Sequence, residues 1–165
     1  VVGVRASEGR PAFVANNGRL RTYMENGGTL IVQYQQGEYT ARELPPYPAT
    51  APQNSRVTEE LAPVRILAPN NPVFTFPNRI TNADFDNWVQ ERNLYAFNTW
   101  DAKYTPLLES QDRGEMPQRG AQLYAEVGKG RYVYTAYAWF RQLQAGVPGA
   151  YRQFANLISL SKAPR

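Results

Sequence analysis

The chain contains no cysteine and no histidine among its 165 residues. These two absences exclude a cysteine nucleophile, a Ser-His-Asp triad and a zinc site of the usual Cys or His kind. The sequence also lacks any apolar run close to the roughly 20 residues that a membrane-spanning helix needs. We therefore predict that this segment holds no catalytic residue, no metal and no cofactor, and that it does not span a membrane.

Charge of one sign is not concentrated anywhere in the sequence. The 18 Lys and Arg residues exceed the 14 Asp and Glu residues, giving a net charge of +4, and the basic residues stand singly. Binding to nucleic acid needs a concentrated basic stripe, so nucleic acid is not expected as a partner. The absence of cysteine is compatible with export but does not decide the redox compartment.

The composition is that of one folded domain. Hydrophobic residues make up 42% of the chain and aromatic residues 13%, which is enough for a packed core. The chain opens on an apolar run, residues 1–4, without an initiator Met or a signal peptide. We therefore expect residues 1–165 to form a single domain of a longer protein. An exported or periplasmic location is expected, with the cytoplasm as the alternative.

The N-terminal part of the sequence predicts a strand, a helix and a second strand. Residues 1–4 have the pattern of a strand that is buried on both faces. Phe13, Leu20 and Met24 follow at helical spacing, and two glycines end the helix. Residues 29–34 have the pattern of another buried strand, so a parallel βαβ unit is expected.

A β-hairpin is predicted for residues 120–137. Apolar and polar side chains alternate on both sides of Gly128, Lys129 and Gly130, and glycine accepts the positive φ that tight turns require. After the hairpin, the glycines and proline at 146–149 open a final helix. Its apolar face is expected to hold these residues: Tyr151, Phe154, Leu157 and Ile158.

The middle of the chain has weaker patterns. Short strands are expected at 64–67, 94–97 and 105–108, with ordered loops at 35–55 and 112–118. Thr81 or Asn82 can cap a helix whose single face would hold these residues: Phe85, Trp88, Val89 and Arg92.

Two groups of motifs resemble known families. Residues 20–32 (LRTYMENGGTLIV) and 128–134 (GKGRYVY) resemble the class I glutamine amidotransferase-like domains, including their trehalose-utilisation (ThuA-like) branch. A longer and more specific set resembles the C-terminal domain of large bacterial PIG-L/LmbE-type deacetylases, and this resemblance covers nearly the whole chain. The segments that carry it are 78–81 (NRIT), 88–92 (WVQER), 140–143 (FRQL) and 151–157 (YRQFANL).

The resemblance implies an α/β fold and a non-catalytic role. The fold would be a flavodoxin-like three-layer sandwich with a mainly parallel sheet plus the antiparallel hairpin, its first strands lying upstream of Val1. True amidotransferases carry a cysteine after the strand that resembles residues 30–33, where this chain has Tyr34 and Gln35. The deacetylases hold zinc in a separate N-terminal domain. The resemblance thus implies an accessory domain of a zinc-dependent N-acetyl-sugar deacetylase, which assembles with neighbouring domains or presents carbohydrate.

Ligand-binding residues are expected where parallel strands end, because open α/β sheets place their sites at the carboxyl ends of the strands. Arg5 follows the first predicted strand and Tyr34 follows the second, while Trp139, Phe140 and Arg141 follow the hairpin. These five residues form the predicted binding site, with carbohydrate as the expected ligand class.

Each of these predictions has a structural alternative. Arg5, Arg56 and Arg141 either bind an anionic ligand or form salt bridges and carbonyl caps. The aromatic residues, Trp88 and Trp100 among them, either form a platform for sugar rings or belong to the core. The carboxylates either supply the pair that a carbohydrate hydrolase needs or form ion pairs, as Glu91 could with Arg92. The carboxylates concerned are Glu59, Glu60, Asp84, Asp86, Glu91 and Asp101.

Overall fold

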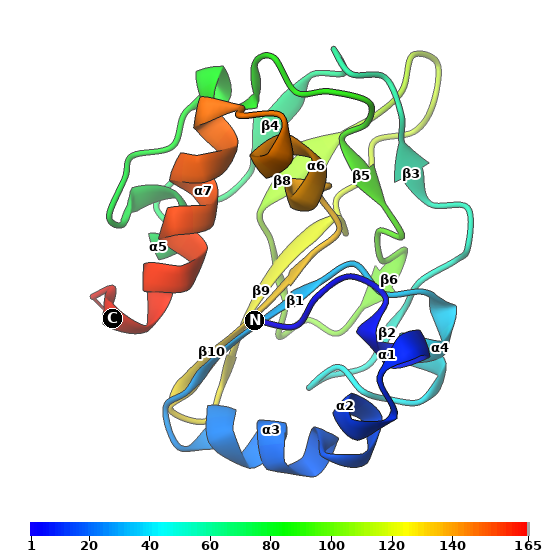
Figure 1. Cartoon of the computed structure of the whole chain (residues 1–165), viewed down its shortest axis with the longest axis vertical. Coiled ribbons are helices and arrows are strands. Elements are labelled where there is room, and N and C mark those ends of the chain that lie inside the picture. The colour runs from blue at the N-terminus through cyan, green and yellow to red at the C-terminus, as the bar shows by residue number, and fades with distance from the viewer. Residues whose placement is uncertain (165) are drawn as a thin grey trace.

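The computed structural model describes residues 1–164, and a four-stranded mixed sheet lies at its centre (Figure 1). The order is β1-β10-β9-β7, formed by Thr29–Gln33, Gly130–Thr135, Gln122–Val127 and Thr105–Pro106. Only β1 and β10 run parallel, while β9 is antiparallel to both β10 and β7. The protein is therefore of the α/β class, but the expected mainly parallel sheet is not found in residues 1–164. The tight hairpin forces β9 and β10 to be antiparallel.

The first strand of the predicted βαβ unit is almost absent. Val2 makes a single parallel bridge to Val32, with its N–H 2.8 Å from the Ile31 carbonyl oxygen. The direction of this pairing agrees with the prediction, but no further ladder forms and Val1 is exposed. The predicted strand at 1–4 is thus reduced to one bridge.

Two helices, α2 (Pro11–Ala15) and α3 (Asn17–Glu25), replace the single expected one, and a further short helix, α1 (Ala6–Gly9), precedes them. The break between α2 and α3 falls at Asn16, whose side-chain Nδ2 donates to the Ala12 carbonyl oxygen at 2.8 Å. Asn and Gly at positions 16–18 have low helix propensity, which explains an interruption at this point.

The hairpin is confirmed, with Gly130 opposite Val127 at its closed end. Gly128 adopts φ +59°, and a Cβ added there would lie 2.7 Å from the Cα atom and carbonyl oxygen of Glu25. Glycine is therefore required both by the turn and by the close approach of α3.

Three small antiparallel sheets surround the central one. β2 (Ala49–Thr50) pairs with β6 (Thr99–Trp100), β3 (Arg56–Val57) with β5 (Asn93–Leu94), and β4 (Val64–Ile66) with β8 (Leu108–Ser110). The strand predicted at 64–67 is confirmed. The one predicted at 94–97 is shorter, and residues 105–108 are divided between β7 and β8. The loop at 35–55 also contains a short helix, α4 (Gly37–Ala41).

The helix expected to continue to Arg92 is limited to a 3-10 helix, η1 (Asn82–Phe85). Thr81 and Asp84 form a capping box at its start, so the predicted helix start is confirmed. The helix ends at Asp86, whose backbone is extended, and it does not resume because Asn87 and Gln90 adopt φ +60° and +72°.

The C-terminal part contains α6 (Trp139–Gln144), α7 (Pro148–Ser159) and η2 (Leu160–Lys162), and α5 (Pro72–Thr75) packs against α7. In Figure 1, α7 lies on one side of the central strands and α1 to α4 lie on the other. None of the helices within residues 1–164 is both long and apolar enough to cross a membrane.

The predicted face of α7 is only partly buried. Leu157 lies in the core, but Tyr151 and Ile158 are exposed, while Gln153 and Asn156 are buried. The Asn156 side chain accepts from the Asn78 N–H at 2.9 Å and donates to the Val73 carbonyl oxygen at 2.9 Å. The helix therefore buries a polar side because that side satisfies the backbone of the loop around α5.

Candidate functional site

The carboxyl ends of β1 and β10 meet at one edge of the sheet, as the parallel pairing requires. Tyr34, which follows β1, packs edge to face against Phe140, with ring centroids 6.0 Å apart. The Arg141 guanidinium lies 4.8 Å from the Phe140 ring centroid, and the Arg5 N–H donates to the Tyr34 carbonyl oxygen at 3.0 Å. Four of the five predicted residues, Arg5, Tyr34, Phe140 and Arg141, therefore lie together; we call this group the edge cluster.

The fifth predicted residue, Trp139, is a core residue. Its side chain is 1% exposed, and its Nε1 donates to the Thr135 Oγ1 at 2.6 Å. Its ring packs edge to face against Trp88, with centroids 5.1 Å apart. Trp139 follows β10 as predicted, but its indole points into the protein and offers no surface to a ligand.

The two arginines of the edge cluster already have anionic partners. Arg5 Nε lies 2.6 Å from the Glu8 carboxylate, and hydrogen bonding to Arg5 lowers the pKa of Glu8. Arg141 Nε lies 2.7 Å from the Glu91 carboxylate. The salt-bridge alternative thus describes both side chains, and Glu91 pairs with Arg141 rather than with its neighbour Arg92.

Buried Arg92 caps carbonyl groups instead. It donates to the carbonyl oxygens of Ala62 at 3.0 Å and Phe85 at 2.5 Å, and desolvation by burial lowers its pKa. Arg56 is exposed on β3.

Unusual backbone conformations accompany the edge cluster. Arg5, Gln90 and Tyr95 have φ of 54°, 72° and 61°, a region that residues other than glycine rarely occupy. The Tyr95 ring lies 5.4 Å from that of Tyr34, and Gln90 accepts from Arg141 at 2.8 Å. Burial raises the pKa of the Tyr34 hydroxyl, whose ring packs against those of Tyr95 and Phe140. Nothing in the sequence indicated that Tyr95 or Gln90 would join this group.

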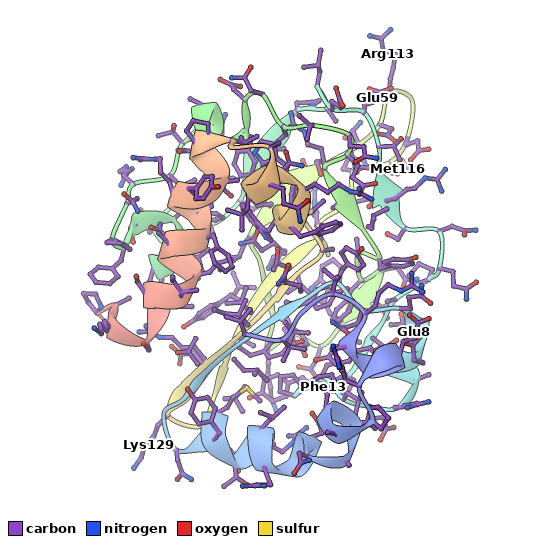
Figure 2. The ribbon with its side chains drawn as sticks, viewed as in Figure 1. Glu8, Phe13, Glu59, Arg113, Met116 and Lys129 are labelled. Carbon is purple, nitrogen blue, oxygen red and sulfur yellow. The ribbon has the colours of Figure 1, made fainter. Side chains whose placement is uncertain are left out.

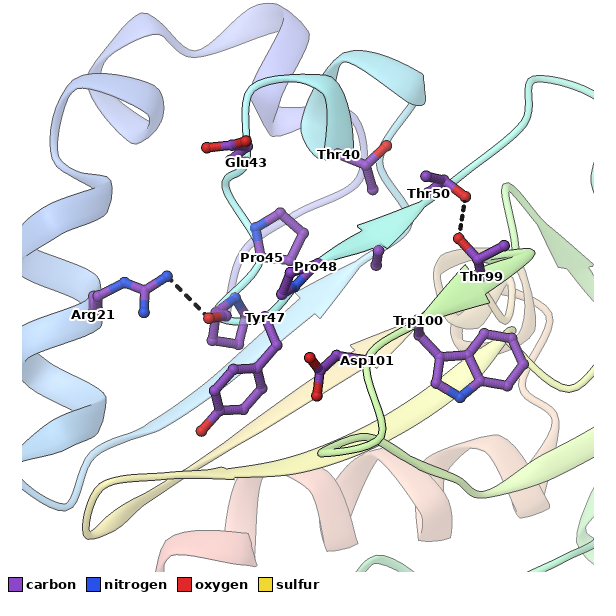
Figure 3. Close-up of a pocket in the computed structure, with 12 residues that line it drawn as sticks. Arg21, Thr40, Glu43, Pro45, Tyr47, Pro48, Thr50, Thr99, Trp100 and Asp101 are labelled. Carbon is purple, nitrogen blue, oxygen red and sulfur yellow. Dashed lines mark hydrogen bonds between the residues drawn. The ribbon is translucent and has the colours of Figure 1, made fainter.

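A groove that the sequence did not predict lies between the end of α4 and the β2–β6 ribbon (Figure 3). Its volume is about 600 Å³, within the range of about 300 to 1,000 Å³ usual for small-molecule sites. Figure 3 shows the Asp101 carboxylate between the rings of Tyr47 and Trp100. We call it the Trp100 groove, and its lining comprises Arg21, Thr40, Glu43, Pro45, Pro46, Tyr47, Pro48, Ala49, Thr50, Thr99, Trp100 and Asp101.

One wall of the Trp100 groove is the proline-rich loop 45–48, which is held in place from several sides. Arg21 donates to the Pro46 carbonyl oxygen at 3.0 Å. The Tyr104 hydroxyl accepts from the Tyr47 N–H at 3.2 Å and donates to the Tyr47 carbonyl oxygen at 3.0 Å. The Tyr47 hydroxyl donates to the Glu126 carbonyl oxygen at 2.7 Å. Little conformational entropy therefore remains to be lost on binding.

The opposite wall is β6 and the residue after it. The Trp100 indole rests against Gly120, where an added Cβ would come within 2.9 Å of the indole Cζ3. Asp101 Oδ1 accepts from the Lys103 N–H at 2.9 Å. In the part of the chain that the structure describes, the Trp100 Nε1 and the second Asp101 oxygen have no hydrogen-bond partner, so a donor and an acceptor remain available to a ligand.

Glu43 stands at the rim of the Trp100 groove in a left-handed conformation, with φ 53°. The Glu43 N–H donates to the Thr40 carbonyl oxygen and the Leu44 N–H to that of Tyr39. These two bonds form the Schellman motif that ends α4, with Glu43 at the position that glycine usually occupies. Its carboxylate makes no hydrogen bond or ion pair within residues 1–164.

Of the six carboxylates considered from the sequence, Asp101 lines the Trp100 groove. Four others make structural interactions: Glu91 pairs with Arg141 and Asp84 with Arg152, each at 2.7 Å, and Glu59 and Glu60 accept from the N–H groups of Arg113 and Gln90. The second groove carboxylate is Glu43, which no sequence pattern had singled out.

No model of a known protein family matches the chain, and no curated protein matches it.

Proposed function

We propose that this chain is a non-catalytic carbohydrate-binding domain, which holds a saccharide in the Trp100 groove for a neighbouring domain of a longer protein. The motif resemblance supports a place in a PIG-L/LmbE-type deacetylase, with the described α/β unit as the larger part of an amidotransferase-like, flavodoxin-like fold. On this proposal the deacetylation chemistry belongs to another domain, and this segment contributes affinity for the sugar.

The observation that carries the proposal is the combination of side chains in the Trp100 groove. A pyranose ring has an apolar C–H face that packs on aromatic rings and a rim of hydroxyl groups that hydrogen-bond to polar side chains. Tyr47 and Trp100 supply aromatic surfaces, and the Asp101 carboxylate lies between them. Thr50 and Thr99 add hydroxyl groups 2.6 Å apart on the paired strands.

The test is calorimetric titration with N,N′-diacetylchitobiose and with cellobiose. Trp100→Ala is expected to weaken binding by about 1 to 3 kcal/mol through lost stacking, and Asp101→Asn by about 1 to 2 kcal/mol. Trp100→Phe serves as the matched control because it keeps a ring in place. If neither disaccharide binds the wild-type chain, the proposal fails.

A sugar site at the edge cluster, as the sequence suggested, is the alternative placement, and the same titration tests it. Tyr34→Ala and Arg141→Ala would each weaken binding by about 1 to 3 kcal/mol if the sugar lay there. Because Arg141 is already paired with Glu91, we expect these two variants to bind like the wild type. Circular dichroism of each variant checks that the fold is intact.

A carbohydrate hydrolase is the second candidate function, since two carboxylates, Glu43 and Asp101, line one groove. Chromatography of chitotetraose and cellotetraose after prolonged incubation separates the two functions. A binding domain returns both sugars intact. A hydrolase shortens them, and Glu43→Gln or Asp101→Asn abolishes the shortening while retaining part of the binding.

A further inference from the structure

The Trp100 groove does not end at Trp100. A second cavity of about 770 Å³ is also lined by Trp100, together with Asn98, which precedes β6. The first cavity is lined by Thr99 and Asp101, so the two cavities meet at Trp100 along the same short stretch of chain. Trp100 is therefore the shared wall of two adjoining cavities.

The second cavity has a lining of similar chemistry. Gln118, Arg119 and Asn98 supply amide and guanidinium groups, while Met116 and Pro117 supply apolar surface. Met116 is 83% exposed and projects from the loop 112–118 at the margin of the molecule (Figure 2). A flexible thioether on a cavity rim suits contact with irregular ligand surfaces, and no packing within the described residues accounts for it.

The positions of the remaining groups favour an uncharged, hydroxyl-rich ligand. Arg119 is already paired with the Glu109 carboxylate at 2.5 Å, and hydrogen bonding to Arg119 lowers the Glu109 pKa. Arg21 in the first cavity is bonded to a backbone carbonyl group, and two carboxylates, Glu43 and Asp101, line the same cavity. Carboxylates outnumber cations there, which disfavours an anionic ligand. The two cavities that meet at Trp100 therefore offer hydrogen-bonding groups and apolar surface to an uncharged ligand.

From this arrangement we infer that the ligand is an oligosaccharide long enough to cross Trp100, with sugar units in both cavities. The inference rests on the proposed function and extends it from a single sugar site to a linear site of at least two subsites. Two linked subsites bind one chain more tightly than either alone, because the second contact is intramolecular.

The test compares N,N′-diacetylchitobiose with chitotetraose on the wild type and three variants by calorimetric titration. Chitotetraose is expected to bind the wild type at least about tenfold more tightly than the disaccharide. Met116→Ala, in the second cavity, should remove at least about a third of that gain and leave disaccharide binding unchanged. Asp101→Asn, in the first cavity, should weaken both sugars by the same factor. Leu61→Ala is the matched control, since Leu61 is 89% exposed and lines neither cavity.

The outcomes separate the inference from the function on which it rests. If both sugars bind with equal affinity and Met116→Ala changes neither, the second cavity is not a subsite and the inference is overturned, while the proposed function stands. If neither sugar binds the wild type, both are overturned. An equal loss for Met116→Ala and Leu61→Ala also overturns the inference, because the effect would then belong to any exposed apolar residue.

Discussion

Glu43 occupies a position where an L-amino acid is strained and glycine is not. The left-handed conformation costs a residue with a Cβ about 1 to 2 kcal/mol, and glycine avoids this cost at the price of greater freedom in the unfolded chain. Strained residues of this kind gather at functional sites. Glu43 combines this strain with a carboxylate that lies on the groove rim and has no partner within the described residues. This combination supports a ligand site in the Trp100 groove.

We expect Glu43→Gly to stabilise the fold by about 0.5 to 1 kcal/mol and to weaken binding of N,N′-diacetylchitobiose by a similar amount. Urea unfolding measures the first effect and calorimetric titration the second. Glu43→Gln is the matched control, since it keeps the strain and a hydrogen-bonding side chain. A glycine variant that binds as tightly as the wild type would mean that Glu43 has no part in the site.

Side-chain partners were the least predictable feature at this scale. The sequence placed Glu91 next to Arg92, but its partner is Arg141, 50 positions away, while Arg92 is buried and donates to backbone carbonyl oxygens. The position of Trp139 after β10 was correct, yet whether an aromatic ring faces solvent or core depends on the packing of distant elements. Local sequence does not contain that information.

Among the elements, the hairpin was the most predictable, since alternation and turn glycines are local signals. What the sequence did not reveal is how tightly α3 packs on it. A Cβ at Gly130 would lie 2.1 Å from the Met24 carbonyl oxygen and 2.2 Å from that of Gly28. Both obstacles are backbone atoms, so they cannot move aside as a flexible side chain would.

Gly130→Ala is therefore expected to destabilise the protein by at least about 2 kcal/mol. Gly18→Ala in α3 is the control, because nothing lies within 4 Å of the added Cβ, and it should be neutral or stabilise by up to about 1 kcal/mol. The midpoints of urea unfolding of the two variants measure this difference in stability. Equal midpoints for the two variants would show that α3 does not approach the hairpin as described.

β10 is buried along its whole length and carries tyrosines that remain protonated in the fold. The Tyr132 hydroxyl lies 2.9 Å from that of Tyr39, and the Tyr134 hydroxyl donates to the Tyr95 carbonyl oxygen at 2.7 Å. Desolvation by burial raises the pKa of Tyr39, Tyr132 and Tyr134 above the ordinary value of about 10.

This predicts a loss of stability in alkali. Above a pH of about 10 the unfolded chain releases these phenol protons while the folded chain keeps them, so stability is complete below that pH and falls as the pH rises. Each such tyrosine contributes about 1.4 kcal/mol per pH unit. Urea midpoints between pH 9 and 11, followed together with tyrosinate absorbance, measure it, and Tyr132→Phe should reduce the slope. Tyrosinate that forms fully while the protein stays folded would contradict the buried arrangement.

In α7, the spacing of the apolar residues did not correctly predict which side of the helix is buried. Its position was predicted from the glycines and proline that precede it, and Leu157 is buried as expected. However, Asn156 is buried against the loop around α5 and Gln153 against η1, where their amides donate to backbone carbonyl oxygens, while Tyr151 and Ile158 are exposed. These partners lie about 70 to 80 positions away, so the spacing of residues within the helix could not reveal them.

For the whole molecule, the sequence predicted the α/β class, the parallel contact of the first residues with β1, and the meeting of the edge cluster. It did not predict the small sheets that frame the Trp100 groove. β2 and β6 are two residues each, and they pair across about 50 positions. Two residues are too few to show an alternating apolar and polar pattern, and such short strands form only because the surrounding core positions them.

The absence of cysteine and histidine leads to a prediction for the chain as a whole. We expect no hydrolysis of glutamine and no deacetylation of N-acetylglucosamine by the isolated chain, with or without added zinc. Coupled glutamate and acetate assays measure both reactions. Turnover that persists after repurification would show that the chain carries chemistry that its side chains do not indicate.

The most direct measurement of the central claim is amide chemical-shift mapping during titration of the labelled chain with chitotetraose. We predict saturable shifts concentrated at Glu43, at the loop 45–50 and at 98–101, extending to Met116, with the amides of Tyr34 and Arg141 unchanged. Shifts centred on Tyr34, Phe140 and Arg141, or no shifts at millimolar sugar, would contradict a saccharide site in the Trp100 groove.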